Sequence, residues 1–452
     1  MEKAFRKEKS IFATILVSCI ACSMLSTALN TALPQILVDF GIDSSTGQWL
    51  TSIYSLVMGI LTLVTPFLIS RFPAKNLYLG TLLIFLAGLL LSGSTTVFPL
   101  MMAGRILQAA GNGIMVAQGQ VLILTMFPPE KRGSVMGIYG LAIGTSPVIA
   151  PTLAGLVVDA FGWRMIFYIV AVVVAASAVM TAVLFENVTG GSRERLDFLS
   201  LALCSVGVCG LLLGAGNVGK YPLAALPVWV PLLAGAAGTA AFAWRQLRME
   251  TPFMELRILR VLRYRIAVIA SMLMYATVMA SSILLPIYIQ SVRGGSATVS
   301  GLVTMPGALA TALISPVSGK LYDKWGIKPL FFVGSVLMLV SSLGMIPSME
   351  GTSMLWIGFL NVVRCAGIGC MMMPFVTWGM SGLKKENTAH GTALITSLRT
   401  VAGAFGSALF VALYNIFAAR GSAYLGMQAA FAGLALFGAA ELFVAVYTWR
   451  RT

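Results

Sequence analysis

Residues Gly319–Lys328 read Gly-Lys-Leu-Tyr-Asp-Lys-Trp-Gly-Ile-Lys and separate two long apolar stretches of the chain. Three lysines and one aspartate fall within these ten residues, although only 10% of the whole chain is charged. A polar connection this short between two membrane-spanning helices is a tight turn that faces water. Gly319 and Gly326 permit close approach of the backbone and a positive φ angle. Asp323 can accept hydrogen bonds from N–H groups at the start of a neighbouring helix.

The composition around this turn is typical of a membrane protein. The chain has 452 residues, 58% of them hydrophobic, and its mean hydropathy is +0.91. Soluble proteins carry about 25% charged residues. The net charge of +15 does not indicate a nucleic-acid partner, because the basic residues are spread over short loops. The six cysteines lie in apolar stretches without acidic or histidine neighbours, which predicts free thiols and no metal site.

Apolar stretches long enough to span a bilayer, which takes about 20 residues, recur along the whole chain. The sequence therefore predicts an all-α membrane protein with 14 transmembrane helices. They are expected at 11–33, 49–69, 77–95, 99–126, 134–158, 165–185, 198–217, 227–246, 266–291, 298–318, 329–347, 353–379, 390–417 and 427–448.

Basic residues gather in alternate loops between these stretches. One side holds 23 of the 30 lysines and arginines, including those near both ends of the chain. The other side holds only Arg164, Lys220, Arg293 and Arg420. Because cytoplasmic loops are enriched in Lys and Arg, we expect both termini in the cytoplasm of a multi-pass protein.

The predicted helices divide into groups of six, two and six. We expect an N-terminal six-helix bundle at 1–190, two inserted linker helices at 191–250, and a cytoplasmic amphipathic segment with the C-terminal six-helix bundle at 251–452. The charged stretch 247–265 predicts an amphipathic helix on the inner leaflet, with a plain linker as the alternative.

The turn at 319–328 resembles the signature loop of the major facilitator superfamily, G-x-L-x-D-[R/K]-x-G-[R/K]. In that family the loop latches the cytoplasmic side, so the resemblance implies a gating role for this turn. The corresponding stretch of the first half, 66–76, keeps only Arg71 and Lys75 of the pattern. The residues expected to form the latch are Gly319, Asp323, Lys324, Gly326 and Arg71.

Further motifs extend this resemblance over nearly the whole chain. Residues 104–113 resemble the family element R-x-x-Q-G-x-G-x-G, and 364–369 stand at the matching place of the second half. In the fifth span, Pro147, Pro151 and Gly155 resemble the antiporter motif G-x-x-x-G-P-x-x-G-G, whose small residues allow close packing and a pivot.

The end of the first span, 24–34, resembles the motif L-D-x-T-x-x-N-x-A-L-P of the drug:proton antiporter branch with fourteen spans. Asn30 matches this motif, whereas Leu25 stands where the branch has its carboxylate. The resemblance implies alternating access by rocking of the two six-helix halves. The departure at Leu25 leaves the proton-coupling residue open.

Three arginines, Arg105, Arg364 and Arg399, fall inside predicted spans, where a charge is costly. Arg105 shares one helix face with Gln108 and Asn112. This polar stripe either lines a central cavity or holds the outer rim closed. The residues expected at a cavity are Asn30, Tyr54, Arg105, Gln108, Asn112, Tyr275, Asn361, Arg364, Met372 and Trp378.

Acidic residues are nearly absent from the predicted spans. Glu441 alone lies well inside one, and Asp159 lies near the outer end of the fifth. Together with Arg399 they are the candidates for ion coupling, and His390 is expected in a solvated loop. Because a buried cation needs a negative partner, we expect neutral or anionic amphipathic substrates rather than permanent cations.

No phosphate-binding loop, nucleophile elbow or paired carboxylates occur, so neither an enzyme nor a cofactor is expected, only a proton or other ion gradient. We expect a monomeric exporter of amphipathic compounds in the plasma membrane, the inner membrane of a bacterium. Such proton-coupled multidrug efflux would confer antibiotic resistance. The alternatives are a dedicated exporter or flippase for an anionic or lipid-like compound, and a non-transporting membrane sensor or scaffold.

Overall fold

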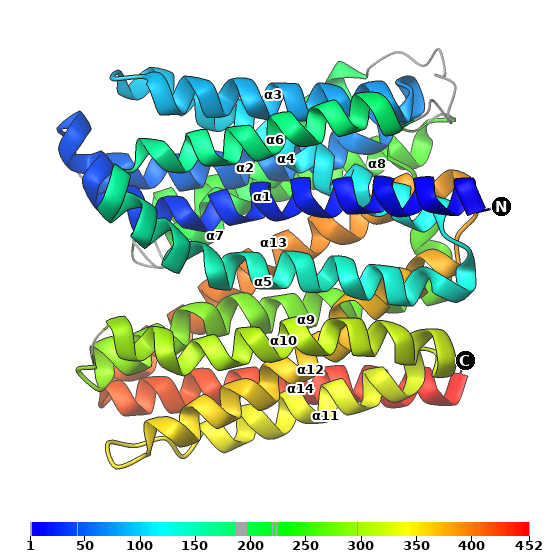
Figure 1. The fold of residues 1–452 in the computed structure, drawn as a ribbon. Helices are drawn as coiled ribbons and strands as arrows, with labels where there is room; N and C mark the ends of the chain where they lie inside the picture. Colours follow the sequence, from blue (N-terminus) through cyan, green and yellow to red (C-terminus); the bar gives the residue numbers. More distant parts are fainter. Residues whose placement is uncertain are drawn as a thin grey trace. The chain divides into compact units, whose positions relative to one another are not determined.

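The computed structural model describes residues 2–42, 44–185, 197–218, 221, 225–250, 252, 254–295 and 297–451. In these ranges the chain forms fourteen long α-helices and no strand, which confirms the all-α prediction (Figure 1). Their bounds are α1 Glu2–Phe40, α2 Ser44–Arg71, α3 Ala74–Ser94, α4 Phe98–Met126, α5 Pro129–Phe161, α6 Arg164–Leu184, α7 Phe198–Asn217, α8 Leu226–Arg248, α9 Leu262–Pro286, α10 Ala297–Trp325, α11 Ile327–Met345, α12 Met354–Ser381, α13 Thr388–Arg420 and α14 Ala423–Arg451. The shorter elements are η1 Leu256–Arg260, η2 Ile287–Val292 and η3 Lys385–Asn387.

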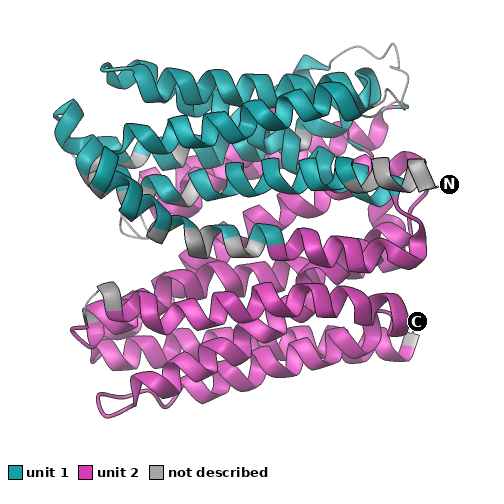
Figure 2. Ribbon diagram, in the orientation of Figure 1, with its two compact units in different colours: residues 1–126, 142–202, 250–254 teal, residues 127–141, 203–249, 255–452 magenta. Residues whose placement is uncertain are grey.

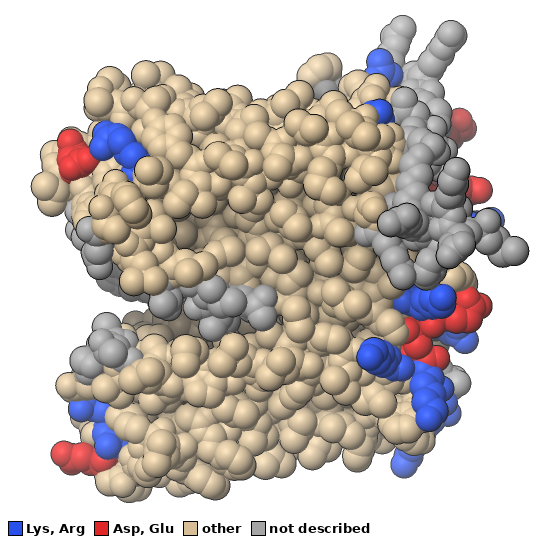
Figure 3. Space-filling view, viewed as in Figure 1, with Lys and Arg blue, Asp and Glu red and all other residues tan. Residues whose placement is uncertain are grey.

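Most of these helices are suited to a bilayer. Among the described residues, eleven are long and apolar enough to cross a membrane, and a bent pair within α2 raises the number to twelve. On the face drawn in Figure 3, the charged side chains lie at the helix ends and the long middle stretches show none. The chain is therefore a multi-pass membrane protein, and the number of fourteen spans stays a prediction.

The helices group into two compact units, which Figure 2 colours separately. Unit 1 consists of residues 1–126, 142–202 and 250–254, and unit 2 of 127–141, 203–249 and 255–452. In unit 1, α3 packs against α4 and α6, and α2 packs against α4. In unit 2, α10 packs against α12, α9 against α13, and α11 against α14. The first turns of α5 group with unit 2, so the division falls inside a helix rather than in a linker.

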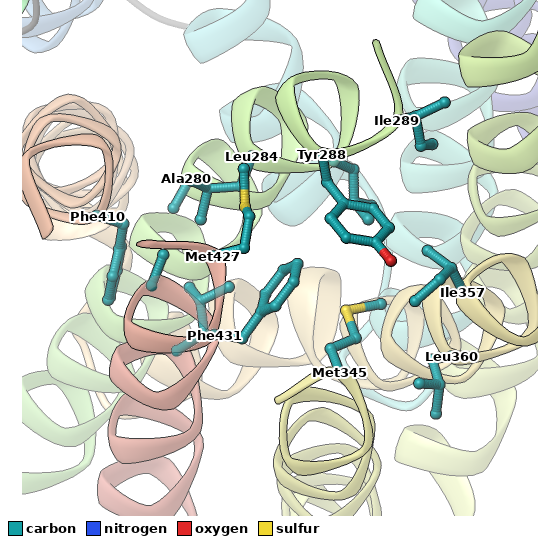
Figure 4. Close-up of a cluster of buried hydrophobic side chains, with 13 residues drawn as sticks. Ala280, Leu284, Tyr288, Ile289, Met345, Ile357, Leu360, Phe410, Met427 and Phe431 are labelled. Carbon is teal, nitrogen blue, oxygen red and sulfur yellow. The ribbon is translucent and has the colours of Figure 1, made fainter. Parts of the chain in front are cut away.

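A cluster of buried apolar side chains fills the space between α9, α12, α13 and α14 in unit 2 (Figure 4). Tyr288 of η2 meets Phe431 of α14 edge to face, with ring centroids 6.3 Å apart. Met345, Ile357 and Phe410 close the cluster from α11, α12 and α13. Because lipid tails are as apolar as these side chains, the cluster stabilises unit 2 mainly through van der Waals packing.

The charged stretch before α9 does not form the predicted amphipathic helix. Helix α8 ends at Arg248, the short 3₁₀ helix η1 spans Leu256–Arg260, and α9 begins at Leu262. Pro252 has no N–H group to continue a helix. The Glu255 side chain caps η1 by accepting a 3.0 Å hydrogen bond from the Arg257 N–H group. The amphipathic-helix prediction was wrong for the described residues of this stretch.

Candidate functional site

The charged turn that opened the sequence analysis is mostly helical. Helix α10 continues to Trp325, so the connection to α11 is Gly326 alone, with a φ angle of 72°. Asp323 therefore stands on the last turn of α10 rather than in a loop. The positive φ angle at Gly326 is one that L-residues rarely adopt, which explains glycine at this position.

Asp323 joins the end of α10 to the start of α5. Its carboxylate accepts hydrogen bonds from the Gly133 N–H group at 2.8 Å and the Ser134 N–H group at 2.7 Å. The Ser134 hydroxyl donates a third bond to the same carboxylate. These donors lie in the second turn of α5. The bonds expected of Asp323 from the sequence are present.

The backbones of α10 and α5 touch beside this carboxylate. A Cβ atom on Gly319 would lie 2.2 Å from the Gly133 carbonyl oxygen, so no larger residue fits without moving one helix. One turn further from the end, the Ser315 hydroxyl donates to the Gly137 carbonyl at 3.1 Å. Lys324 remains exposed, 5.6 Å from the Trp325 ring centroid. The contact therefore depends on glycine and Asp323, and Lys324 does not take part in it.

The predicted polar stripe of α4 is buried inside unit 1. Arg105 is 0% exposed and donates through Nε to the Leu50 carbonyl at 3.2 Å and through Nη1 to Gln108 at 2.7 Å. Its guanidinium carbon lies 4.2 Å from the centroid of the Tyr54 ring. Asn112 donates to the Tyr54 hydroxyl at 2.7 Å. The structure thus brings together four of the predicted cavity residues.

Gln108 extends this network toward α3. Its amide nitrogen donates to the Gly88 carbonyl at 2.8 Å and to the Ser92 hydroxyl at 2.9 Å. A Cβ atom on Gly88 would lie 2.7 Å from the Gly104 carbonyl oxygen, so α3 and α4 meet here without side chains between them. These bonds satisfy groups inside the bundle, which favours the structural interpretation of Arg105 and Gln108.

The second-half counterpart lies inside unit 2. Arg364 of α12 donates through Nη2 to the Asn361 side-chain oxygen, as their i, i+3 spacing predicts. Asn361 donates in turn to the Thr304 carbonyl of α10 at 3.3 Å. The Nε and Nη1 atoms of Arg364 are buried and have no acceptor within hydrogen-bond distance.

Arg399 of α13 faces Tyr275 of α9. The guanidinium carbon lies 5.0 Å from the Tyr275 ring centroid, and Arg399 is 7% exposed. Like those of Arg364, its Nε and Nη1 atoms have no acceptor. Unit 2 therefore holds two buried guanidinium groups with unused donors.

The remaining candidates lie apart from these networks. In α12, Trp378 is buried and Met372 is half-buried, while Arg71 is exposed at the end of α2 and Gly155 is half-buried in α5. Glu441 is 0% exposed in α14, and neither carboxylate oxygen has a hydrogen-bond donor nearby. Four further candidates have side chains outside the described residues: Asn30, Pro147, Pro151 and Asp159.

His390 differs from the prediction of a solvated loop residue. It lies in the first turn of α13, is half-buried, and its Nδ1 atom accepts a 3.3 Å hydrogen bond from the Glu255 N–H group. Among the described residues, no group of three or more His, Cys, Asp and Glu side chains could hold a metal ion.

One polar cluster in unit 1 was missed at the sequence level. The Asp39 carboxylate accepts 2.8 Å bonds from the Trp163 indole N–H and from Arg164 Nη1, while Arg164 Nη2 donates to the Thr95 carbonyl at 3.2 Å. These bonds join the end of α1 to the start of α6. The Trp163 hydrogen bond and then that of Arg164 hold the pKa of Asp39 below its ordinary value. The available signal was an acid ending the first apolar stretch and the Trp-Arg pair starting the sixth.

Comparison with known proteins places the chain among transporters. A model described as Major Facilitator Superfamily matches residues 15–407. The "Uncharacterized MFS-type transporter YcnB" of Bacillus subtilis (strain 168) is 36% identical over 431 residues, 94% of this chain and 91% of the relative. The "Lincomycin resistance protein LmrB" of the same organism is 33% identical over 409 residues, 90% of this chain and 85% of the relative.

A solved structure shares the fold. The proton:xylose symporter XylE, bound to 6-bromo-6-deoxy-D-glucose, matches with a TM-score of 0.64 at 13% sequence identity, covering 99% of this chain and 96% of the symporter. At this identity the likeness concerns the fold alone.

Proposed function

Because the chain belongs to the Major Facilitator Superfamily, we propose that it is a secondary transporter that exports amphipathic small molecules across the plasma membrane by alternating access. The relative named for lincomycin resistance supports efflux of an antibiotic. A proton gradient, used in antiport, is the proposed source of energy. The proposed form is a monomer with both termini in the cytoplasm of a bacterial cell, so its membrane is the inner one.

The observation that carries this proposal is the contact of Asp323 with α5. An alternating-access transporter needs contacts that form in one state and break in the other. Three donors of Gly133 and Ser134 converge on one carboxylate at the water-facing end of α10, with no cation among them. Hydrogen bonds to a charged group near water are strong enough to bias a conformation and weak enough to exchange with water. We propose that this contact closes the cytoplasmic side in the outward-facing state.

Substitution of Asp323 tests the latch directly. Asp323→Asn keeps the size of the side chain but removes the charge and one acceptor oxygen. Since a charged hydrogen bond contributes about 1.5–3 kcal/mol, we expect transport to fall about 10-fold or more while the protein inserts and purifies normally. Glu350→Gln, at an exposed acid of the α11–α12 connection, is the matched control and should transport like the unmodified chain.

The assay is uptake into inverted vesicles or proteoliposomes, with and without a pH gradient. The panel holds lincomycin, ethidium, a lipophilic carboxylate and a neutral compound of similar size. Gradient-dependent, saturable movement of several compounds supports efflux of the multidrug type. Movement of one compound alone would favour a dedicated exporter or flippase. Movement of none, with protein correctly inserted, would favour a sensor or scaffold and contradict the proposal.

A further inference from the structure

Arg399 has the environment of a binding residue rather than of a structural one. It is 7% exposed, and its guanidinium carbon lies 5.0 Å from the Tyr275 ring centroid. The face of an aromatic ring attracts a cation but cannot accept the N–H groups that lie in the guanidinium plane. The Nε and Nη1 atoms of Arg399 have no acceptor within hydrogen-bond distance. Leaving such donors unused is costly inside a membrane protein.

Hydroxyl groups with unused hydrogen-bonding capacity accompany this arginine. Thr396, which lies one turn before Arg399 on the same face of α13, is 8% exposed, and its side-chain oxygen has no partner. The Ser271 hydroxyl of α9 is likewise buried without a partner. Two hydroxyl donors and one guanidinium on two touching helices are more unused donors than packing requires.

The register of α9 against α13 puts Ser271 near the level of Arg399. The Tyr264 hydroxyl donates to the Gly391 carbonyl at 2.7 Å, and a Cβ atom on Gly403 would lie 2.8 Å from the Tyr275 ring. The contact that lies later in α9 also lies later in α13, so the two helices run parallel. Ser271 lies on α9 between these contacts, as Arg399 does on α13.

Negative charge is missing from both helices. Neither α9 nor α13 contains an aspartate or a glutamate. The groups that interact electrostatically with Arg399 are the phenol side chains of Tyr275 and of Tyr139 in α5. Arg105 inside unit 1 donates to both Leu50 and Gln108, and only its Nη2 atom is without an acceptor. The charge of Arg399 therefore lacks the compensation that a buried cation needs.

We propose that Arg399, with Thr396 and Ser271, binds the anionic group of an amphipathic substrate, and that this group is a carboxylate attached to an apolar ring system. A carboxylate offers several acceptor sites to guanidinium and hydroxyl donors, and charge-assisted bonds of this kind are strong. Tyr275, which is half-buried, offers its ring to the apolar part of the substrate. This assignment rests on the transport function proposed above and specifies its substrate class.

A pair of matched probes tests the assignment. Pyrenebutyrate and pyrenebutanol share the ring system and the linker and differ in the carboxylate. Binding is measured as saturable energy transfer from protein tryptophan to pyrene, with the full chain in nanodiscs of zwitterionic lipid. We expect the unmodified chain to bind the carboxylate about 10- to 100-fold more tightly than the alcohol. Arg399→Gln should abolish this preference and leave the affinity for the alcohol within about 2-fold.

Two further variants keep the test decisive. Arg399→Lys retains the charge without the planar fork and should recover only part of the preference. The double variant Thr396→Ala with Ser271→Ala should weaken carboxylate binding alone. Arg420→Gln, at the exposed end of the same helix, is the control and should bind both probes normally. If Arg399→Gln does not purify as a monodisperse protein, the lysine and double variants carry the test.

The outcomes separate this assignment from the proposed function. Equal affinity for both probes in the unmodified chain, or equal losses for both in the variants, would overturn the anion site while leaving transport intact. Failure to move any compound of the vesicle panel would instead overturn the transport function. Displacement of pyrenebutyrate by phosphatidylglycerol added to the nanodiscs would support the anion site and identify anionic lipid as an occupant.

Discussion

Three buried arginines show that one residue type serves different purposes within a single chain. Arg105 is held by the Leu50 carbonyl, Gln108 and the Tyr54 ring, so its charge is spread over groups of its own unit. Arg364 donates to Asn361, and Arg399 faces Tyr275 with unused donors. The sequence placed all three inside predicted spans, where a charge is costly. It could not rank them, because their acceptors come from helices far away in the chain.

The Asp39 cluster gives a prediction about pH at the same scale. The pKa of Asp39 is lowered in the folded state, so its bonds stabilise the fold fully above the ordinary carboxyl pKa of 3.8 and are lost as the pH falls through the lower folded-state pKa. Asp39→Asn should lower the thermal midpoint by about 1–3 °C at pH 7, a small effect because the pair is partly exposed. The difference should be the same at pH 5 and should shrink below pH 3.8.

Thermal unfolding of purified protein followed by tryptophan fluorescence measures this difference. Glu350→Gln is the control, because Glu350 is an exposed acid. This variant should leave the thermal midpoint unchanged at either pH. An Asp39→Asn variant with an unchanged midpoint at pH 7 would mean that the bonds to Trp163 and Arg164 exchange freely with water.

At the scale of elements, the close contact of α10 with α5 is the feature that a small substitution can alter. A Cβ atom on Gly319 would lie 2.2 Å from the Gly133 carbonyl oxygen. A Cβ atom on Gly301, in the same helix, would have no neighbouring atom within 4 Å. Overpacking costs about 1–3 kcal/mol, so Gly319→Ala should shift the equilibrium toward separated helices by about 5- to 150-fold. A cysteine at Ser134 should then react faster with a hydrophilic maleimide applied from the cytoplasmic side.

Gly301→Ala is the matched control, because it adds the same methyl group to α10 in open space. The labelling of the native cysteines is subtracted with the chain that lacks the Ser134 replacement. Equal labelling rates in the two glycine variants would mean that α10 and α5 do not move apart here.

The sequence predicted those features of the helices that depend on neighbouring residues in the chain. It did not predict which residues far apart in the chain are in contact. The bonds of Asp323 were predictable, because an acid next to a tight connection meets the N–H groups of a helix start. The continuation of α10 to Trp325 was not, because Lys320 and Lys324 favour helix but interrupt the apolar stretch from which a span is predicted. The Asp39–Trp163 bond joins residues 124 positions apart, and no local pattern encodes such a pairing.

At the scale of the whole molecule, the number of spans depends on a few helices. Among the described residues, α7 and α8 are both long and apolar enough to cross a membrane, and the described part of α1 holds an apolar helical segment at Ser10–Leu25. Helix α1 begins with four basic residues, and α5 begins with Glu130, Lys131 and Arg132. Both helices are nevertheless long, with 39 and 33 residues, and each has an apolar stretch beyond its charged start. Length and loop charge together therefore favour fourteen spans over twelve.

Maleimide labelling of single cysteines introduced at helix ends measures the number of membrane spans. In the fourteen-span arrangement, Ile42 after α1, Phe161 at the end of α5 and Tyr221 between α7 and α8 face the outside, whereas Lys131 and Arg248 face the cytoplasm. The first three should react with a membrane-impermeant maleimide in intact cells, and the last two only after permeabilisation. Native cysteines give little background, since all six are buried or half-buried among the described residues. If a cysteine at position 221 does not react with the maleimide in intact cells, α7 and α8 do not cross the membrane and twelve spans remain. Protection of Phe161 would show that α5 does not cross, which would place the ends of the first bundle on the wrong sides for the Asp323 contact to close the cytoplasmic face.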